Sequence, residues 1–383
     1  MSLNVSLISN SLFPRSARAA SPTLMIAEKE DKGSPSDRIA YYTELIKSKP
    51  DNWYAYYRRG LAKEDAGDIS GAMSDLEQAS KLVKPGALFE DCLLLNFGRL
   101  KIMYGDPKEG KDILLGLIKK STLISPKDLE QCYVNLASAE LKLKDYDAGI
   151  AHCDYVIAKI NPKSLKAHIN RGTCLLAANR YEEAAACYRK IVTALDKTNE
   201  SAWRNLGDSL YMKKDLKGAR EAYETALRLD GKDVAALVMC GNVCSQLEDF
   251  DAGERYYQRA LAIDPKNESA LQNLDVARKN RAIAWQKKGD ALYDKKDYRG
   301  AREVYEKALK LFDKDIALLI MCGNACCQLD DFAAGEAYYT RVLDIDSNNA
   351  DALQNRSVAR RNLGDFKGAA EDLARANQLS GKK

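Results

Sequence analysis

The chain contains an internal duplication, and this feature restricts its fold more than any other. Residues 203–280 return at 285–362 with well over half of the positions identical. Trp203, for example, aligns with Trp285, which lies 82 residues later. Identity at this level indicates one structural unit that was copied, rather than two segments that share a composition by chance.

Each copy also has a shorter period of its own. The succession returns after 34 residues, as Trp203, Leu206, Gly207, Tyr223 and Ala226 and then as Leu237, Cys240, Gly241, Tyr257 and Ala260. Helical periodicity extends from about residue 38 to the end, and strand-like alternation is hard to find. One pair of helices cannot bury its apolar face alone, so the period predicts stacked helix pairs around a continuous core.

At this period, the order Trp, Leu-Gly, Tyr, Ala, Tyr, Ala, Pro resembles the tetratricopeptide repeat family. The best single match is SAWRNLGDSLYMKKDLKGAREAYETALRLD at 201–230. Further copies begin at Asn52, Gln131, Lys166, Trp285 and Ala352, with a degenerate copy between residues 91 and 118. The resemblance implies an all-α, right-handed superhelical solenoid of helix-turn-helix repeats, about nine of them in two sub-arrays.

Three segments are expected along the chain. Residues 1–37 are Ser-rich and are interpreted as a disordered tail or a targeting segment. Residues 38–280 form the first tetratricopeptide array, and residues 281–383 form the second. Two 34-residue repeats fall 14 residues short of the 82-residue shift between copies. The extra residues, 267–280, match a first helix with no second helix behind it, so we expect them to form a capping helix.

The joint and the C-terminal end carry two further expectations. No Pro or turn dipeptide separates the cap from the second array, so Glu268 to about Lys295 should form one long helix or two abutting ones. No cap helix follows the last repeat, which ends near Ala376. Self-association through this uncapped C-terminal repeat is therefore expected.

Charge and hydropathy exclude several classes of partner. The formal charge is +4, from 59 basic and 55 acidic residues spread along the chain. Nucleic-acid binding needs a basic stripe, which is missing here, so no nucleic acid is expected as a partner. No apolar run approaches the roughly 18 residues of a membrane helix, so no membrane insertion is expected.

The copied phrase carries cysteines that raise the question of a metal site. Cys240 and Cys244 return as Cys322 and Cys326. A closed structural zinc site needs four ligands, and two repeats and a spacer separate the two pairs. We interpret the cysteines as small core residues, with no metal and no cofactor. The ten cysteines lack zinc-knuckle spacing and favour a reducing compartment.

Catalytic chemistry finds little support in the sequence. Only His152 and His168 are present, and neither stands in an arrangement typical of a nucleophile site. The glycines fall at repeat positions rather than in a phosphate-binding loop. We therefore expect a protein that is not an enzyme.

The resemblance implies a concave groove lined by first-helix residues that binds extended peptides of partner proteins. The candidate groove residues are Asn135, Lys166, Asn170, Arg204, Asn205, Asp208, Asn242, Asp290, Asn324 and Asn355. Asparagine recurs among them, and its amide can donate to and accept from a peptide backbone at once. The alternative is that these residues are ordinary exposed polar side chains.

One subfamily of these repeats binds the acidic C-terminus of heat-shock chaperones with two Lys, two Asn and one Arg. Asn135 matches the middle Asn and Lys166 the third-repeat Lys. Asn170 stands where Arg is expected, and Leu95 and Arg99 replace the first Lys and Asn. The match is therefore partial.

Together these features predict a scaffold or adaptor that binds one or more proteins. The alternative is a chaperone or co-chaperone subunit for a dedicated client, by heat-shock chaperone tail binding or as a secretion chaperone. The expected location is the cytoplasm, with organelle targeting or secretion by way of residues 1–37 as the alternative.

Overall fold

The computed structural model of the chain describes residues 33–120 and 124–381. They form two compact units, 33–178 and 179–381. The prediction for the N-terminal tail lies outside the described residues up to residue 32. The described residues contain helices and no strand, and none of their helices has the length and apolar character needed to cross a membrane.

The first unit consists of one single helix followed by helix pairs. Its elements are α2 (Pro35–Ser48), α3 (Trp53–Asp65), α4 (Ile69–Leu82), α5 (Glu90–Tyr104), α6 (Pro107–Lys120), α7 (Pro126–Leu143), α8 (Tyr146–Tyr155), the π-helical turn η1 (Val156–Ile160) and α9 (Leu165–Ala177). Helix α2 begins three residues before the predicted start at 38 because Ser34 caps it and Pro35 opens it.

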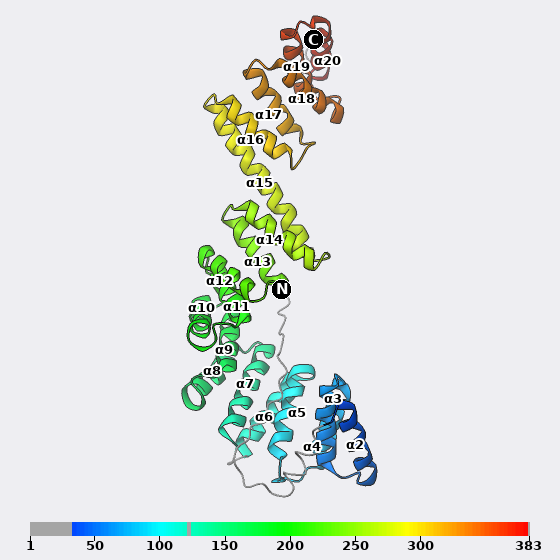
Figure 1. Cartoon of the computed structure of the whole chain (residues 1–383), viewed down its shortest axis with the longest axis vertical. Coiled ribbons are helices and arrows are strands. Elements are labelled where there is room, and N and C mark those ends of the chain that lie inside the picture. The colour runs from blue at the N-terminus through cyan, green and yellow to red at the C-terminus, as the bar shows by residue number, and fades with distance from the viewer. Residues whose placement is uncertain (1–32, 121–123, 382–383) are drawn as a thin grey trace. The chain divides into compact units, whose positions relative to one another are not determined.

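The second unit contains both copies of the duplicated segment (Figure 1). Its elements are α10 (Tyr181–Lys190), the π-helical turn η2 (Ile191–Leu195), α11 (Glu200–Met212), α12 (Leu216–Leu229), α13 (Val234–Gln246), α14 (Phe250–Ile263), α15 (Glu268–Asp294), α16 (Tyr298–Leu309), α17 (Ile316–Gln328), α18 (Phe332–Ile345), α19 (Ala350–Asn362) and α20 (Phe366–Leu379). The all-α solenoid of helix-turn-helix repeats is confirmed.

The same short turn joins the two helices of most repeats. Lys214 and Glu248 adopt left-handed backbone conformations, with φ of 67° and 59°. The aspartate that follows each of them, Asp215 or Asp249, caps the second helix by accepting the N–H three residues on. Such a cap contributes about 1 kcal/mol, so the aspartate of each turn also marks the start of the second helix.

Glycine sets the distance between the two helices of a repeat. A Cβ on Gly207 would lie 2.6 Å from Cδ1 of Tyr223, and one on Gly323 would lie 2.6 Å from Cε1 of Tyr339. Each tyrosine is almost fully buried. The glycine therefore provides the space in which the ring of the second helix packs against the backbone of the first.

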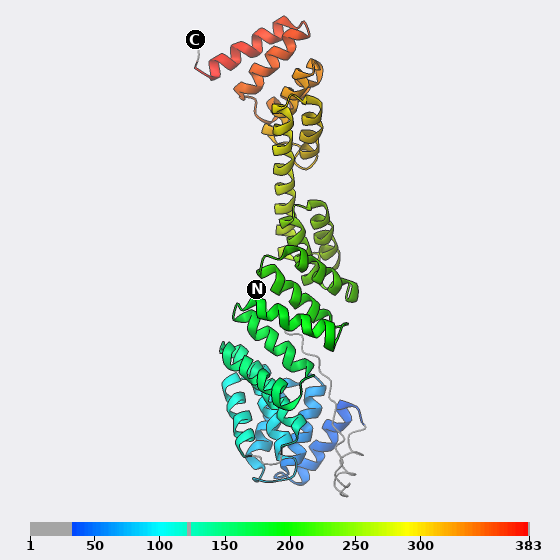
Figure 2. The same ribbon diagram turned by 90° about the vertical axis from the view of Figure 1, so that its left-hand side faces the viewer.

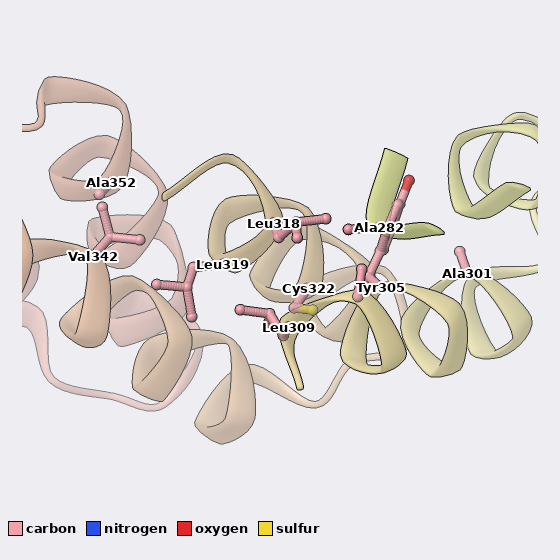
Figure 3. Close-up of a cluster of buried hydrophobic side chains, with 10 residues drawn as sticks. Ala282, Ala301, Tyr305, Leu309, Leu318, Leu319, Cys322, Val342 and Ala352 are labelled. Atoms are coloured by element: carbon pink, nitrogen blue, oxygen red, sulfur yellow. The ribbon is translucent and has the colours of Figure 1, made fainter. Parts of the chain in front are cut away.

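Between neighbouring repeats, small residues and leucines fill the core. Figure 3 shows one such cluster, in which Tyr305 of α16, Leu319 and Cys322 of α17, and Val342 of α18 point into a common interior. Ala282 of α15 belongs to the same cluster. Continuous packing of this kind is what makes a solenoid stable although no single repeat has a core of its own.

The joint between the copies is one unbroken helix. Helix α15 has 27 residues, a length of about 40 Å, and it passes α14 before it pairs with α16 (Figures 1 and 2). Of the two alternatives stated for this segment, the structure has the single helix. The predicted boundary at 280/281 lies inside this helix, and the division into two arrays there stays a prediction.

The two copies of the segment that forms the start of α15 and the whole of α19 have different neighbours. Leu353 of α19 is 1% exposed because α20 covers it, whereas the equivalent Leu271 of α15 is 48% exposed. Ser357 is buried at the close-packing position of α19, and the equivalent position of α15 is the exposed Asp275. A charged residue is tolerated there because no second helix packs on this half of α15, as expected of a capping segment.

A glycine substitution tests the close helix approach. We expect Gly207→Ala to destabilise the chain by about 1–2 kcal/mol, since overpacking against Tyr223 exceeds the gain in helix propensity. The matched control is Gly116→Ala in α6, where a Cβ would meet nothing within 4 Å. That variant should gain about 0.5–1 kcal/mol. Urea unfolding followed by circular dichroism measures both, and equal effects would contradict the packing argument.

A proline tests whether α15 holds the two copies together. Lys279→Pro should break the helix at a cost of about 3 kcal/mol or more, so small-angle scattering should show a wider range of shapes. Glu268→Pro is the control, because Pro is tolerated at the first position of a helix. Unchanged scattering of the Lys279 variant would mean that the joint is already flexible.

Candidate functional site

Within each unit, the first helices of successive repeats lie side by side and present one surface, here called the first-helix face. In the first unit, Asn170 Nδ2 of α9 donates to Val134 O and Ser138 Oγ of α7, at 3.0 Å each. In the second unit, Asn273 Nδ2 of α15 donates to Asn242 Oδ1 of α13 at 2.8 Å. Amide side chains therefore connect neighbouring first helices in both units.

Asn135 is the most distinctive residue of the first-helix face in the first unit. It is 8% exposed, and its Oδ1 accepts a hydrogen bond from Gln131 Nε2 at 3.2 Å. Its Nδ2 is buried and has no hydrogen-bond partner among the described residues. A buried donor without a partner costs about 1–3 kcal/mol, so this atom marks a place where a bound group would supply an acceptor.

The structure brings the other two predicted residues of this unit close to Asn135. Asn170 bonds to the carbonyl of Val134, the residue next to Asn135. Lys166 lies one turn before Asn170 on α9, is exposed, and forms no ion pair or hydrogen bond with another described residue. A buried donor and an uncommitted cation therefore lie on adjoining turns of α7 and α9.

Four predicted residues bond instead to the tyrosine of their own repeat. The tyrosine hydroxyl donates to the side-chain oxygen in Tyr223–Asp208 (2.6 Å), Tyr257–Asn242 (2.8 Å), Tyr305–Asp290 (2.7 Å) and Tyr339–Asn324 (2.7 Å). Burial raises the pKa of Asp208, and the Tyr223 hydrogen bond opposes this shift. These residues have a structural role, and their role in binding a peptide stays a prediction.

Arg204 and Asn205 are also committed within the second unit. Arg204 Nη1 lies 2.8 Å from Oδ2 of Asp233, the residue that caps α13. Asn205 Nδ2 donates to the Tyr188 hydroxyl at 3.3 Å. Asn355 Nδ2 donates to Asn324 Oδ1 at 3.2 Å, so it is the one predicted residue of α19 that joins the first-helix face.

Asn273 and the repeat tyrosines take part in these contacts but are not among the predicted residues. Asn273 is equivalent to Asn355, and the 82-residue alignment that matches the two was a sufficient signal to include it. The rings of the tyrosines lie in the core. No sequence signal indicated that their hydroxyls bond to the polar residue after the glycine.

The positions that complete a chaperone clamp are occupied by packed side chains. Leu95 of α5 is buried. Arg99 forms an ion pair with Glu64 of α3, with 2.6 Å between Nη2 and Oε2. The first-helix face therefore has no free cation at these two positions, where the clamp pattern has Lys and Asn.

The cysteines of the copied phrase are buried thiols. Cys240, Cys244, Cys322 and Cys326 are free and fully buried. Burial raises the pKa of Cys244 to about 11 and that of Cys322 to about 12, so both remain protonated at neutral pH. The described residues contain no cluster of His, Cys, Asp or Glu able to hold a metal ion.

The two histidines belong to separate structural contacts. The His168 ring lies 3.1 Å from Pro162 O. His152 Nε2 lies 3.7 Å from Oε1 of the buried Glu140, which pairs with Lys111 at 2.8 Å. Burial lowers the pKa of His152, against the opposing effect of Glu140.

Removal of two buried thiols tests their role as core residues. The double variant Cys240→Ala with Cys244→Ala should lose about 1–2 kcal/mol of unfolding free energy, because each change removes only one buried atom. Elemental analysis of the wild-type chain should find no stoichiometric zinc. One zinc per chain that disappears in the double variant would show a metal site instead.

Comparison with known families identifies the repeats. Models described as "Tetratricopeptide repeat" match residues 30–84, 134–200, 200–233, 234–267 and 282–315, which together are more than half of the chain. The chain belongs to the tetratricopeptide repeat family.

Two curated relatives show how far the similarity extends. Human DnaJ homolog subfamily C member 7 is 26% identical over 220 residues, covering 55% of this chain and 44% of its own length. A tetratricopeptide repeat-containing protein of Methanocaldococcus jannaschii is 23% identical over 370 residues, covering 79% of this chain and 65% of its own. The chain thus spans less than half of the human relative.

A solved structure supports the fold alone. The C-terminal part of a tetratricopeptide repeat-containing protein from Cytophaga hutchinsonii covers 65% of this chain and 97% of its own, at 15% identity and a TM-score of 0.50. Proteins of this repeat family bind segments of partner proteins, and the fold of this chain is a scaffold of that kind.

Proposed function

We propose that the chain is a protein-interaction scaffold whose first-helix face binds an extended segment of a partner protein. The observation that carries this proposal is the buried Asn135 Nδ2, which lacks an acceptor among the described residues. A carbonyl or carboxylate of a bound segment would provide that acceptor. Lys166, on the adjoining turn of α9, would strengthen the bond to an acidic group.

The proposed scaffold has no catalytic activity of its own. Its polar face consists mainly of amides, which hold a peptide backbone and do not transfer protons at neutral pH. The free cysteines support a reducing location such as the cytoplasm. Targeting or secretion by way of residues 1–37 is the alternative.

A co-chaperone role is the second candidate function. It is supported by the similarity to the human DnaJ homolog, which covers 55% of this chain. It also agrees with the partial clamp formed by Asn135 and Lys166. Leu95 and Asn170 weaken it, because they stand where the clamp has Lys and Arg, and an acidic tail would meet one uncommitted lysine rather than several cations.

Partner capture with a double variant tests the proposal. Asn135→Ala with Lys166→Ala should weaken capture at least about tenfold while the chain remains equally stable or gains slightly, because a buried donor without a partner is removed. Capture should also fall as salt is added, since Lys166 would pair with an acid. Calorimetry and thermal unfolding measure the two effects separately.

The control removes positive charge away from this face. Lys159→Ala with Lys163→Ala removes exposed lysines of η1 and the following loop and should leave capture unchanged. Undiminished capture by the Asn135 and Lys166 double variant would contradict binding at this place. Capture of several members of one complex would favour a scaffold, and a single heat-shock chaperone or stoichiometric client would favour a co-chaperone.

A further inference from the structure

The second unit presents two equivalent surfaces, here called the twin faces. The first twin face consists of Met239, Asn242, Gln246, Gln272, Asn273 and Val276 on α13 and α15. The second consists of Met321, Asn324, Gln328, Gln354, Asn355 and Val358 on α17 and α19. Each residue of the first is identical to its counterpart 82 positions later.

The hydrogen bonds of the twin faces are the same as well. Asn242 Oδ1 accepts from the Tyr257 hydroxyl and from Asn273 Nδ2. Asn324 Oδ1 accepts from the Tyr339 hydroxyl and from Asn355 Nδ2 in the same way. An amide oxygen has two lone pairs, so both are used in each case.

These bonds leave one donor and one acceptor exposed in each pair. Asn242 Nδ2 has only the weak acceptor Met239 Sδ, at 3.6 Å. Asn273 Oδ1 accepts no hydrogen bond from the described residues. One donor next to one acceptor matches the C=O and N–H of an extended peptide backbone.

Packing does not explain why the twin faces stayed the same. Val276 is 52% exposed and Val358 is 48% exposed, so neither side chain is held by a core. The exposed positions of α14 and α18 were retained only in part: Asp251/Ala333, Arg255/Ala337 and Ala262/Asp344 differ, whereas Arg259/Arg341 and Ile263/Ile345 are identical. Complete retention of the twin faces beside partial retention of the exposed side of α14 and α18 favours a contact at the twin faces.

We propose that both twin faces bind the same class of ligand, an uncharged extended peptide segment with an aliphatic side chain, so that one chain binds two copies of it. This inference rests on the proposed function and specifies the partner. The asparagine pair would hold the peptide backbone, and the exposed valine and the methionine would contact the aliphatic side chain.

The lack of charge on the twin faces favours an uncharged peptide over an acidic one. All twelve side chains are uncharged, so an acidic tail would gain no ion pair there and would lose hydration. An exposed valine cannot form an ion pair or a hydrogen bond with a charged side chain. It stabilises a complex when a bound apolar side chain removes its surface from water. The twin faces thus differ from the Asn135 and Lys166 region, where a cation is present.

Two identical sites on one chain should bind a partner that carries the peptide segment twice more tightly than a partner that carries it once. The second contact becomes intramolecular, and a well-matched linker raises overall affinity by about 10²–10⁴ over a single contact. A partner with tandem motifs, or a symmetric dimer, would therefore bind far more tightly than a partner with one motif.

The test uses a display library of random linear peptides as its probe. Peptides are selected on the full chain in which Val358→Lys and Asn355→Ala disable the second twin face. Both substitutions change side chains that are exposed or half-buried, so the fold should not be affected. Enriched peptides are then measured by calorimetry on the wild-type chain and on a chain disabled at the first face by Val276→Lys and Asn273→Ala. Thermal unfolding checks that each variant is folded, and Ala262→Lys with Ala333→Lys is the matched surface control.

We expect two peptides per wild-type chain and one per chain with either face disabled, with dissociation constants for the two faces within about threefold. Tandem peptides should bind the wild type at least about a hundredfold more tightly than single ones, and this gain should vanish when either face is disabled. The control should bind as the wild type does.

Other outcomes separate the two proposals. Peptides that bind only the face on which they were selected, or one peptide per wild-type chain, would overturn the inference alone. Peptides that bind the wild type regardless of both sets of substitutions would also overturn it and leave the scaffold function in place. A library that yields no binder to the wild-type chain would overturn both.

Discussion

The contact of a second-helix tyrosine with a first-helix glycine is the interaction on which the rest of the repeat depends. Tyr257 lies against Gly241, and its hydroxyl donates to Asn242. Apolar packing and a hydrogen bond thus fix both the distance and the register of the two helices. Because the same contact recurs in consecutive repeats, the first helices are held at a regular spacing and present their polar side chains on one face.

The contact is replaced in the first and last described helix pairs. Arg59 of α3 binds Asp75 of α4 with 2.8 Å between Nε and Oδ2, and Arg356 of α19 binds Asp372 of α20 with 2.7 Å between Nη2 and Oδ1. Each pair is bidentate and largely buried, so its two parallel hydrogen bonds also fix the orientation of the guanidinium against the carboxylate. Ion pairs thus align the helices of these two pairs, whose second helices have Leu76 and Leu373 in place of the tyrosine.

Much of the fold could be predicted because it follows from local rules. The 34-residue period, the glycine positions and the aspartate caps are all readable in the sequence and agree with one another. The candidate site was harder to predict from the sequence. The choice of Asn135 and Lys166 depended on a repeat register, but the unsatisfied Asn135 Nδ2 becomes visible only when the neighbouring helices are in place. The pairing of Asp208, Asn242, Asp290 and Asn324 with tyrosines could not be inferred, since a polar residue at a first-helix position is compatible with both an exposed and a bonded side chain.

The sequence by itself determined the repeat architecture and the copied segment. Both depend on periodicity. Only the tertiary structure decided which polar side chains are free to bind. Hydrogen-bond partners such as Asn242 and Asn273 come from different helices, 31 residues apart. Whether an amide is satisfied depends on the distance between those helices, which the packing of the tyrosines and glycines sets.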